Sequence, residues 1–147
     1  MEERNQPSKY WNKYENIYNI NQIICGEHSI NAVIDFTSPC VHPICWEVIR
    51  SYSIADRECA DGNINIENLK RYVSKFLEYG KLNNYDLKVM PYLYFYQLLF
   101  PNYYNQYYLS NQSNKQLFLD NAHFCTKLCK WFEFNINNLS DELARGF

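Results

Sequence analysis

The sequence lacks the features that would place it in a nucleic-acid-binding, exported or membrane-spanning class. It has no run of Lys and Arg and a formal net charge of -2, so nucleic acid and anionic membranes are not favoured partners. It has no stretch of about 18 apolar residues, and its first seven residues, MEERNQP, carry no signal-peptide hydrophobic region. We therefore expect a cytoplasmic protein with no membrane segment.

The six cysteines lack the close pairs of a metal site. Cys40, His42 and Cys45 lie within six residues, and His123 lies near Cys125, but no C-x-x-C pair occurs. Structural zinc sites usually contain such pairs, so buried thiols and a histidine in a turn are favoured over zinc. Because nothing indicates export, we expect the thiols to be reduced.

The composition predicts one packed domain. Apolar residues make up 47% of the 147 residues and aromatic residues 18%, which argues against disorder. Residues 1–13 are mostly polar and are expected to form a leader. Residues 14–147 are expected to form a mainly α-helical domain with one small β-hairpin near its N-terminus.

Apolar residues at helical spacing predict helices from about residue 43 to residue 134. The first begins at Pro43, where the missing N–H costs little, and ends at residues 61–63. The second is capped by Asn65 and ended by Gly80 in a left-handed conformation. The side chains expected to face the core from these two helices are Ile44, Val48, Tyr52, Ala55, Cys59, Leu69, Tyr72, Val73, Phe76 and Leu77.

The second half of the chain continues the helical pattern. Asp86 is a candidate cap for a third helix, which is expected either to break at Pro91 or to begin again there. Residues 93–100 are nearly all apolar and are expected to be buried, and a short aromatic helix or turn follows at 103–108. The last helix is expected over residues 117–134, with one further turn in the tail.

The tyrosines of residues 92–108 form the densest aromatic segment. A surface that stacks nucleic-acid bases combines aromatic rings with a cationic groove. Lys and Arg are absent between Lys88 and Lys115, so the pattern favours core packing, with hydroxyl groups at the surface, over base stacking.

Two apolar runs near the N-terminus predict a hairpin over residues 22–36. The runs Gln22–Cys25 and Asn31–Phe36 are separated by a five-residue loop that contains glycine. The second run ends with Asp35, and a carboxylate there is costly unless a cation or hydrogen-bond donors satisfy it. Asp35 is therefore either a metal ligand or an acid that caps the turn after the strand.

The V-I-D-F strand, the proline-containing turns and the helix Trp46-Glu-Val-Ile-Arg50 resemble the carboxyl half of the aminoglycoside phosphotransferase family. That family includes choline, homoserine and fructosamine kinases and has a protein-kinase-like fold. The resemblance covers about residues 14–134 and implies the helical C-terminal lobe of that fold. It implies that Asn21 and Asp35 hold Mg²⁺ on the phosphates of ATP. It further implies that Glu47, Arg50 and Tyr94 line the pocket of the acceptor substrate.

The chain departs from the family at its catalytic loop, H-G-D-x-x-x-x-N. With the last position on Asn21, the first three positions fall on Tyr14-Glu15-Asn16. Asn16 then occupies the place of the catalytic base, and an amide does not accept a proton from a hydroxyl group near neutral pH. The residues before Tyr14 contain neither a glycine-rich loop nor a strand lysine, so the nucleotide-binding lobe has no counterpart here.

Two functional hypotheses follow. In the first, the chain is the C-terminal lobe of an ATP-dependent phosphotransferase that acts on a small-molecule hydroxyl, with the N-lobe supplied by a separate polypeptide. It is then expected to be inactive alone, and whether it binds Mg²⁺ or ATP without that lobe is left open. In the second, it is a non-catalytic helical domain derived from that fold that binds a small molecule or a protein partner. Its exposed apolar face then drives homodimer formation or capture of a partner.

Overall fold

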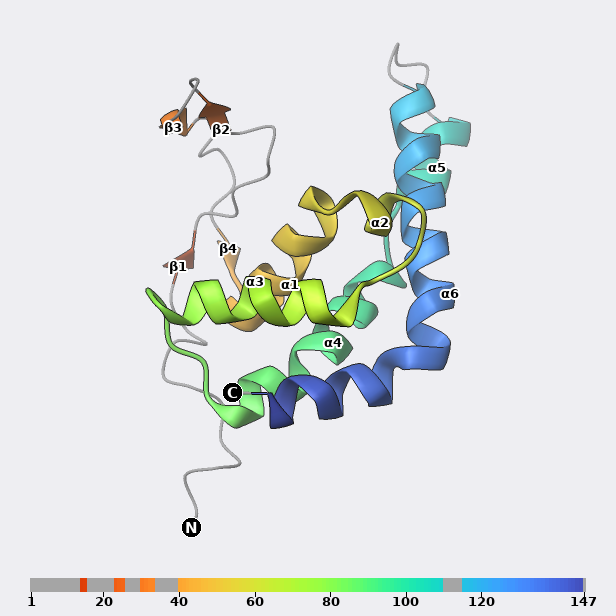
Figure 1. Cartoon of the computed structure of the whole chain (residues 1–147). Helices are drawn as coiled ribbons and strands as arrows, with labels where there is room; N and C mark the ends of the chain where they lie inside the picture. Colours follow the sequence, from red (N-terminus) through yellow and green to blue (C-terminus); the bar gives the residue numbers. More distant parts are fainter. Residues whose placement is uncertain (1–13, 16–22, 26–29, 34–39, 110–114, 147) are drawn as a thin grey trace.

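Helices make up most of the chain that the structure describes, as the periodicity predicted. The structure is a computed structural model; it describes residues 14–15, 23–25, 30–33, 40–109 and 115–146, with side chains from His42 onward. The helices are α1 Ile44–Ala55, α2 Arg57–Ala60, α3 Ile66–Leu77, α4 Asn84–Leu98, α5 Tyr103–Leu109 and α6 Lys115–Arg145 (Figure 1). No helix within these ranges combines the length and apolarity needed to cross a membrane.

Before α1, the described residues include two antiparallel strand pairs. They are β1 (Tyr14–Glu15) with β4 (Cys40–Val41), and β2 (Ile23–Cys25) with β3 (Ile30–Val33). Ile30 lies in β3 opposite Cys25, whereas the sequence placed it in the loop; its β-branched side chain suits a strand. Residues 26–29 and 34–39 lie outside the described residues, so the hairpin expected over residues 22–36 stays a prediction.

One aspartate divides the first predicted helix in two. α1 ends at Ala55, and Asp56 adopts an extended backbone, with φ -84° and ψ 129°. The Asp56 side chain accepts a hydrogen bond from the Glu58 amide at 2.8 Å. Asp is a preferred N-cap residue, so it begins the separate helix α2. Cys59 is buried as predicted, but in α2, and Ala55 is exposed.

The turn between α2 and α3 requires a glycine. Gly62 has φ 86°, and a Cβ atom there would lie 2.6 Å from Cβ of Lys127 on α6. Asn65 then caps α3 as predicted, since its side chain accepts a hydrogen bond from the Asn68 amide at 3.1 Å. The turn thus brings α3 back across α1, as Figure 1 shows.

Two expectations for α3 were wrong. Tyr72 is exposed rather than buried, because its hydroxyl reaches Ser51 Oγ, 3.0 Å away at the surface. Gly80 does not have the left-handed conformation expected of it, since Gly62 is the glycine with positive φ in the described residues. The ring of Phe76 lies where a side chain at Gly80 would be. Position 80 therefore needs a glycine because the Phe76 ring approaches its backbone closely, and not because the backbone is left-handed there.

α4 begins at a capping box and continues through a proline. The Asn83 side chain accepts from the Asp86 amide and the Asp86 side chain accepts from the Asn83 amide, both at 2.9 Å. Asn83, and not Asp86, is therefore the N-cap. The helix neither breaks nor restarts at Pro91, which has no N–H for the preceding turn. In that turn the Lys88 carbonyl accepts a hydrogen bond from Ser140 Oγ of α6 at 2.7 Å.

α6 is longer than predicted, and it is bent. It continues to Arg145, beyond the end expected at Phe134. Figure 1 shows one limb beside α5 and a second limb, after the bend, that leads to the C-terminus. Asn135 Nδ2 donates to the Trp131 carbonyl at 2.8 Å. A side chain that competes for a carbonyl of the helical ladder is a recognised cause of such bends.

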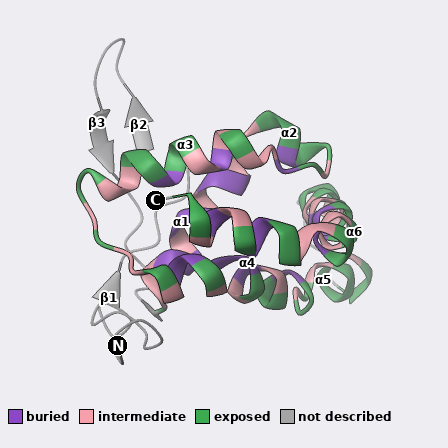
Figure 2. Cartoon of the chain, turned by 60° about the horizontal axis from the view of Figure 1, so that its bottom comes forward, coloured by how far each residue is buried: buried purple, intermediate pink, exposed green. Residues whose placement is uncertain are grey.

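The core lies where α1, α4 and α6 meet. α4 packs most extensively on α6, and α1 packs on α4. Figure 2 shows the buried faces of the helices turned toward the interior. The fully buried side chains include Ile49, Leu69, Val73, Met90, Leu128, Phe132, Leu139 and Leu143. Three side chains expected to be buried are exposed instead, namely Tyr96, Leu99 and Phe100.

Replacing Asn83 by Ala should destabilise the fold, because the first turn of α4 loses its side-chain acceptor. Loss of an N-cap costs about 0.5–2 kcal/mol, which chemical denaturation measures as the free energy of unfolding. Asn84→Ala is the matched control, since Asn84 is exposed and lies in the helix, where Ala is favoured. Equal free energies of unfolding for the two variants would contradict this assignment.

Candidate functional site

The three residues expected in an acceptor pocket have different surroundings. Glu47 Oε1 and Arg50 Nη1 form an ion pair at 2.9 Å on α1, and both side chains are mostly buried. Tyr94 is buried in α4, where its hydroxyl group bonds with Ser53 Oγ of α1. Glu47 also lines a cavity of about 310 Å³ beside α3. None of the three lines the main cavity described below, and their role in binding an acceptor stays a prediction.

The catalytic-loop and metal positions implied by the resemblance, Asn16, Asn21 and Asp35, lie outside the described residues. Their roles therefore stay predictions. Where the structure describes side chains, no three His, Cys, Asp or Glu residues gather as a metal site. The motif of Cys40, His42 and Cys45 is not covered by that finding, because the Cys40 side chain is not among those described.

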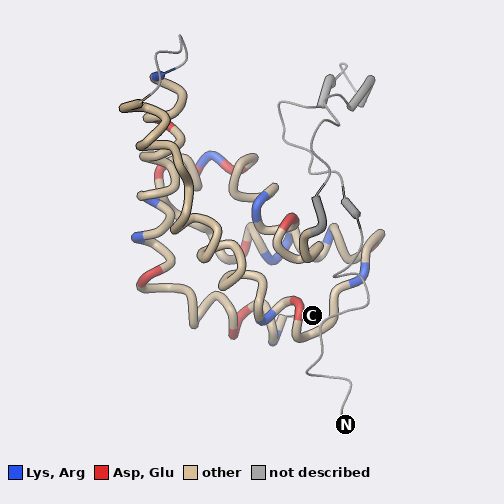
Figure 3. The backbone as a smooth tube through the Cα atoms, turned by 180° about the vertical axis from the view of Figure 1, so that it is seen from behind, with Lys and Arg blue, Asp and Glu red and all other residues tan. Residues whose placement is uncertain are grey.

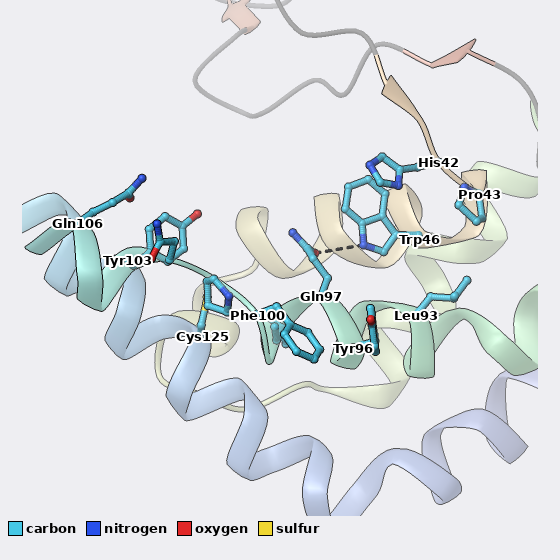
Figure 4. Close-up of a pocket in the computed structure, with 13 residues that line it drawn as sticks. His42, Pro43, Trp46, Leu93, Tyr96, Gln97, Phe100, Tyr103, Gln106 and Cys125 are labelled. Atoms are coloured by element: carbon cyan, nitrogen blue, oxygen red, sulfur yellow. Dashed lines mark hydrogen bonds between the residues drawn. The ribbon is translucent and has the colours of Figure 1, made fainter.

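The candidate site is a cavity of about 610 Å³ between the start of α1, the C-terminal part of α4 and α5 (Figure 4). This volume is typical of a small-molecule pocket. Five rings line it, from His42, Trp46, Tyr96, Phe100 and Tyr103. Three amide side chains also line it, from Gln97, Asn102 and Gln106.

Trp46 is the most firmly held of these rings. Its Nε1–H donates to Gln97 Oε1 at 3.1 Å, which links α1 to α4 and is the dashed line in Figure 4. The His42 ring lies 4.3 Å from it, centroid to centroid, and the Arg50 guanidinium carbon lies 5.4 Å from its centroid. These three contacts hold the Trp46 ring in place beside the cavity.

The opposite side of the cavity belongs to α4 and α5. The centroids of the Tyr96 and Phe100 rings lie 4.8 Å apart, and both side chains are largely exposed. Tyr103 is half-buried at the start of α5, and burial raises the pKa of its phenol although the Arg50 charge opposes the shift. The hydroxyl of Tyr103 is therefore a neutral hydrogen-bonding group at physiological pH.

The described residues that line the cavity include none of Asp, Glu, Lys or Arg. His42, one of the lining residues, is exposed. The Glu47–Arg50 ion pair is not among the lining residues. The site thus offers π faces and amide groups but no counter-ion, an arrangement suited to an uncharged ligand.

The cysteines whose side chains are described are unpaired, as predicted. They are Cys45, Cys59, Cys125 and Cys129. Burial raises the pKa of Cys45 and of Cys59 to about 12 and that of Cys125 to about 11. Cys125 lines the cavity, but its thiol is protonated near neutral pH and is not an activated nucleophile.

Sequence reasoning missed the cavity. It placed residues 93–100 in the core, whereas α4 ends at Leu98 and leaves Tyr96 and Phe100 exposed around a hollow. The signal available in the sequence was the group of amides, among them Gln97, Asn102 and Gln106, within an aromatic segment that has no Lys or Arg. Such amides have no reason to lie inside a purely apolar core.

Comparison of the chain with models of known protein families, with curated proteins and with solved structures found no match. The resemblance to phosphotransferases therefore rests on the residues that carry it in the sequence.

Raising the pH above 9 should destabilise the fold through its buried thiols. Cys45 has its ordinary pKa of 9.0 in the unfolded chain and a pKa of about 12 in the fold. Between these values the unfolded chain binds fewer protons, so the free energy of unfolding falls as pH rises. Urea unfolding from pH 7 to pH 11 measures this fall. Cys45→Ala should be less stable at pH 7 but should lose less stability with pH, and an identical loss in both proteins would contradict the assignment.

Proposed function

We propose that this chain is a helical binding domain that holds an uncharged, planar aromatic molecule in the cavity between α1, α4 and α5. The observation that carries the proposal is a wall of five rings with three amides and no charged side chain among the described lining residues. Aromatic walls favour flat aromatic ligands, because offset and edge-to-face ring pairs contribute about 0.5–1.5 kcal/mol beyond the area that they bury.

The amide groups provide polar recognition at the ligand's edge. Gln97 uses its oxygen to accept from Trp46, so its NH₂ group has two further donors to offer a ligand carbonyl or ring nitrogen. Asn102 and Gln106 are exposed on the α5 side and bring both donors and acceptors. A heteroaromatic molecule with a few neutral polar atoms can pack against the aromatic rings and form hydrogen bonds with the amide groups.

A charged ligand is disfavoured by the same surroundings. A cation or anion that enters the cavity loses hydration, and the lining residues described above supply no opposite charge. Aromatic rings do attract cations, but the Arg50 guanidinium already lies over the Trp46 ring. Its positive charge therefore opposes a second cation on this wall.

Three probes with one ring system test the proposal by isothermal titration calorimetry: indole, tryptamine and indole-3-acetate, which are neutral, cationic and anionic at pH 7. We expect indole to bind best, with the two charged probes at least tenfold weaker. Tyr96→Ala should weaken indole binding roughly tenfold, equivalent to about 1.4 kcal/mol. Tyr79→Ala is the matched control, because Tyr79 is 92% exposed and lies outside the cavity.

Two results would overturn the proposal. Tighter binding of tryptamine than of indole would identify a cation-binding aromatic cage instead. The second result is that none of the three probes at millimolar concentration releases or absorbs heat, although circular dichroism shows the protein to be folded. The cavity would then not bind ligands of the proposed class.

The phosphotransferase lobe is a second candidate function, favoured by one observation. The β2–β3 strand pair lies shortly before α1, in the segment that carries the resemblance. In this proposal Asn21 and Asp35 hold Mg²⁺, which neutralises phosphate charge on ATP, and Asn16 leaves the base position without a proton acceptor. Phosphoryl transfer then requires a second chain with a nucleotide-binding lobe.

Mg²⁺ with ATP should raise the melting temperature if this second candidate is correct. At about 100 times the dissociation constant a ligand stabilises by about 2.7 kcal/mol, so a rise of about 5 °C or more is expected. Asp35→Asn should abolish the rise, and Asp120→Asn, a change at an exposed aspartate on α6, should leave it intact. Unchanged melting of the natural chain with Mg²⁺ and ATP would exclude nucleotide binding by the isolated chain.

A further inference from the structure

We propose that the ligand of the cavity is an uncharged heteroaromatic lactam, a ring in which an N–H group stands beside a carbonyl group, as in oxopurines and oxopyrimidines. This inference rests on the proposed function and narrows the class of ligand. Two carboxamide side chains carry it, Gln97 on α4 and Gln106 on α5, because both line the cavity and they come from different sides of it.

Gln97 meets a ligand chiefly as a hydrogen-bond donor. Its Oε1 already accepts from Trp46 Nε1 at 3.1 Å, whereas its NH₂ group has two hydrogens to donate. Figure 4 shows the Gln97 nitrogen turned away from Trp46, toward the side of the cavity where Tyr103 lies. A ligand that meets this group must present an acceptor. A ring carbonyl is a neutral one, and its oxygen has two lone pairs.

Gln106 offers a donor and an acceptor side by side. It is exposed, and it lines the cavity one turn after Tyr103 on α5. A carboxamide can form two parallel hydrogen bonds with a neighbouring donor and acceptor, as Asn and Gln do with the edge of adenine. A lactam has this pattern, because its N–H can donate to Gln106 Oε1 while its carbonyl accepts from Nε2. The neutral hydroxyl of Tyr103 adds a further polar group beside this edge.

The charge distribution favours the neutral ring over a phosphorylated form of it. Residues 89–114, which provide most of the cavity wall, contain no Asp, Glu, Lys or Arg. Figure 3 shows the described part of this segment without a charged residue, whereas charges occur on α1, α3 and α6. A phosphate group on the ring would therefore find no cation among the described lining residues. We expect a free base to bind at least as tightly as its nucleotide.

Titration calorimetry of the full chain with 2-quinolone and N-methyl-2-quinolone tests the lactam assignment. The two probes share one ring system and one carbonyl, but the methyl group replaces the hydrogen that the lactam donates. We expect 2-quinolone to bind roughly tenfold more tightly, equivalent to about 1.4 kcal/mol. Gln106→Met should remove most of this preference, since it keeps the length of the side chain without the amide. Asn105→Met is the matched control, because Asn105 is an exposed carboxamide of α5 that does not line the cavity, and it should keep the preference.

Indole, titrated beside the two quinolones, keeps this inference apart from the proposed function. Equal affinity of the natural chain for the two quinolones, with indole still bound, overturns the lactam assignment alone. A preference that persists undiminished in Gln106→Met also overturns it, because the methyl group would then act through its bulk and not through the lost hydrogen bond. Failure of indole and of both quinolones to bind overturns the proposed function and this inference together. Circular dichroism checks that each variant is folded.

Discussion

The buried hydroxyl group of Tyr94 is the constraint on which the arrangement of the main helices depends. A phenol that leaves water must keep a hydrogen-bond partner, and Ser53 of α1 is that partner. The Tyr94 ring meets Phe132 of α6 edge-on, with centroids 5.9 Å apart. One side chain of α4 thus sets the position of α1 through a polar contact and that of α6 through an aromatic one. Burial raises the pKa of this phenol well above its ordinary value, although the bond to Ser53 opposes the shift.

The same junction explains why the cavity exists. Trp46 and Ser53 lie on one helix, α1, and each contacts α4 through a hydrogen bond, to Gln97 and to Tyr94 respectively. α1 and α4 are therefore held together at two points that lie about two helical turns apart along α1. Beyond Leu98 the chain turns at Pro101 into α5, which packs on α6 rather than on α1. The space left between α5 and the start of α1 is the hollow that the aromatic residues line.

Local signals in the sequence predicted the parts of the fold that depend on local chemistry. Asn65 is a cap because its side chain reaches its own helix, and Gly62 ends a helical segment because the turn needs a positive φ. The continuation of the helix through Pro91 was misjudged, since the local sequence does not reveal how extensively α4 packs on α6. Exposure along residues 93–100 was also misjudged, because apolar spacing does not reveal which side of a helix receives a neighbour.

The candidate site was predictable only in part for the same reason. The ion pair of Glu47 and Arg50 follows from their i,i+3 spacing, whereas the burial of Tyr94 depends on two distant helices. The cavity joins residues from His42 to Cys125, and no local pattern in one sequence relates positions so far apart. The residues that carry the phosphotransferase resemblance form a short continuous segment, which is why sequence reasoning found them first.

The place of α6 in the chain has a consequence for synthesis. α6 is the last described helix, yet it provides Leu128, Phe132, Leu139 and Leu143 to the core and makes the most extensive contact with α4. A ribosome that has made residues 1–109 has therefore released helices whose main packing surface does not yet exist. The apolar face of α4 stays open until α6 emerges, a state in which nascent chains are prone to associate. Stable packing of α1 to α4 must therefore wait until α6 has emerged.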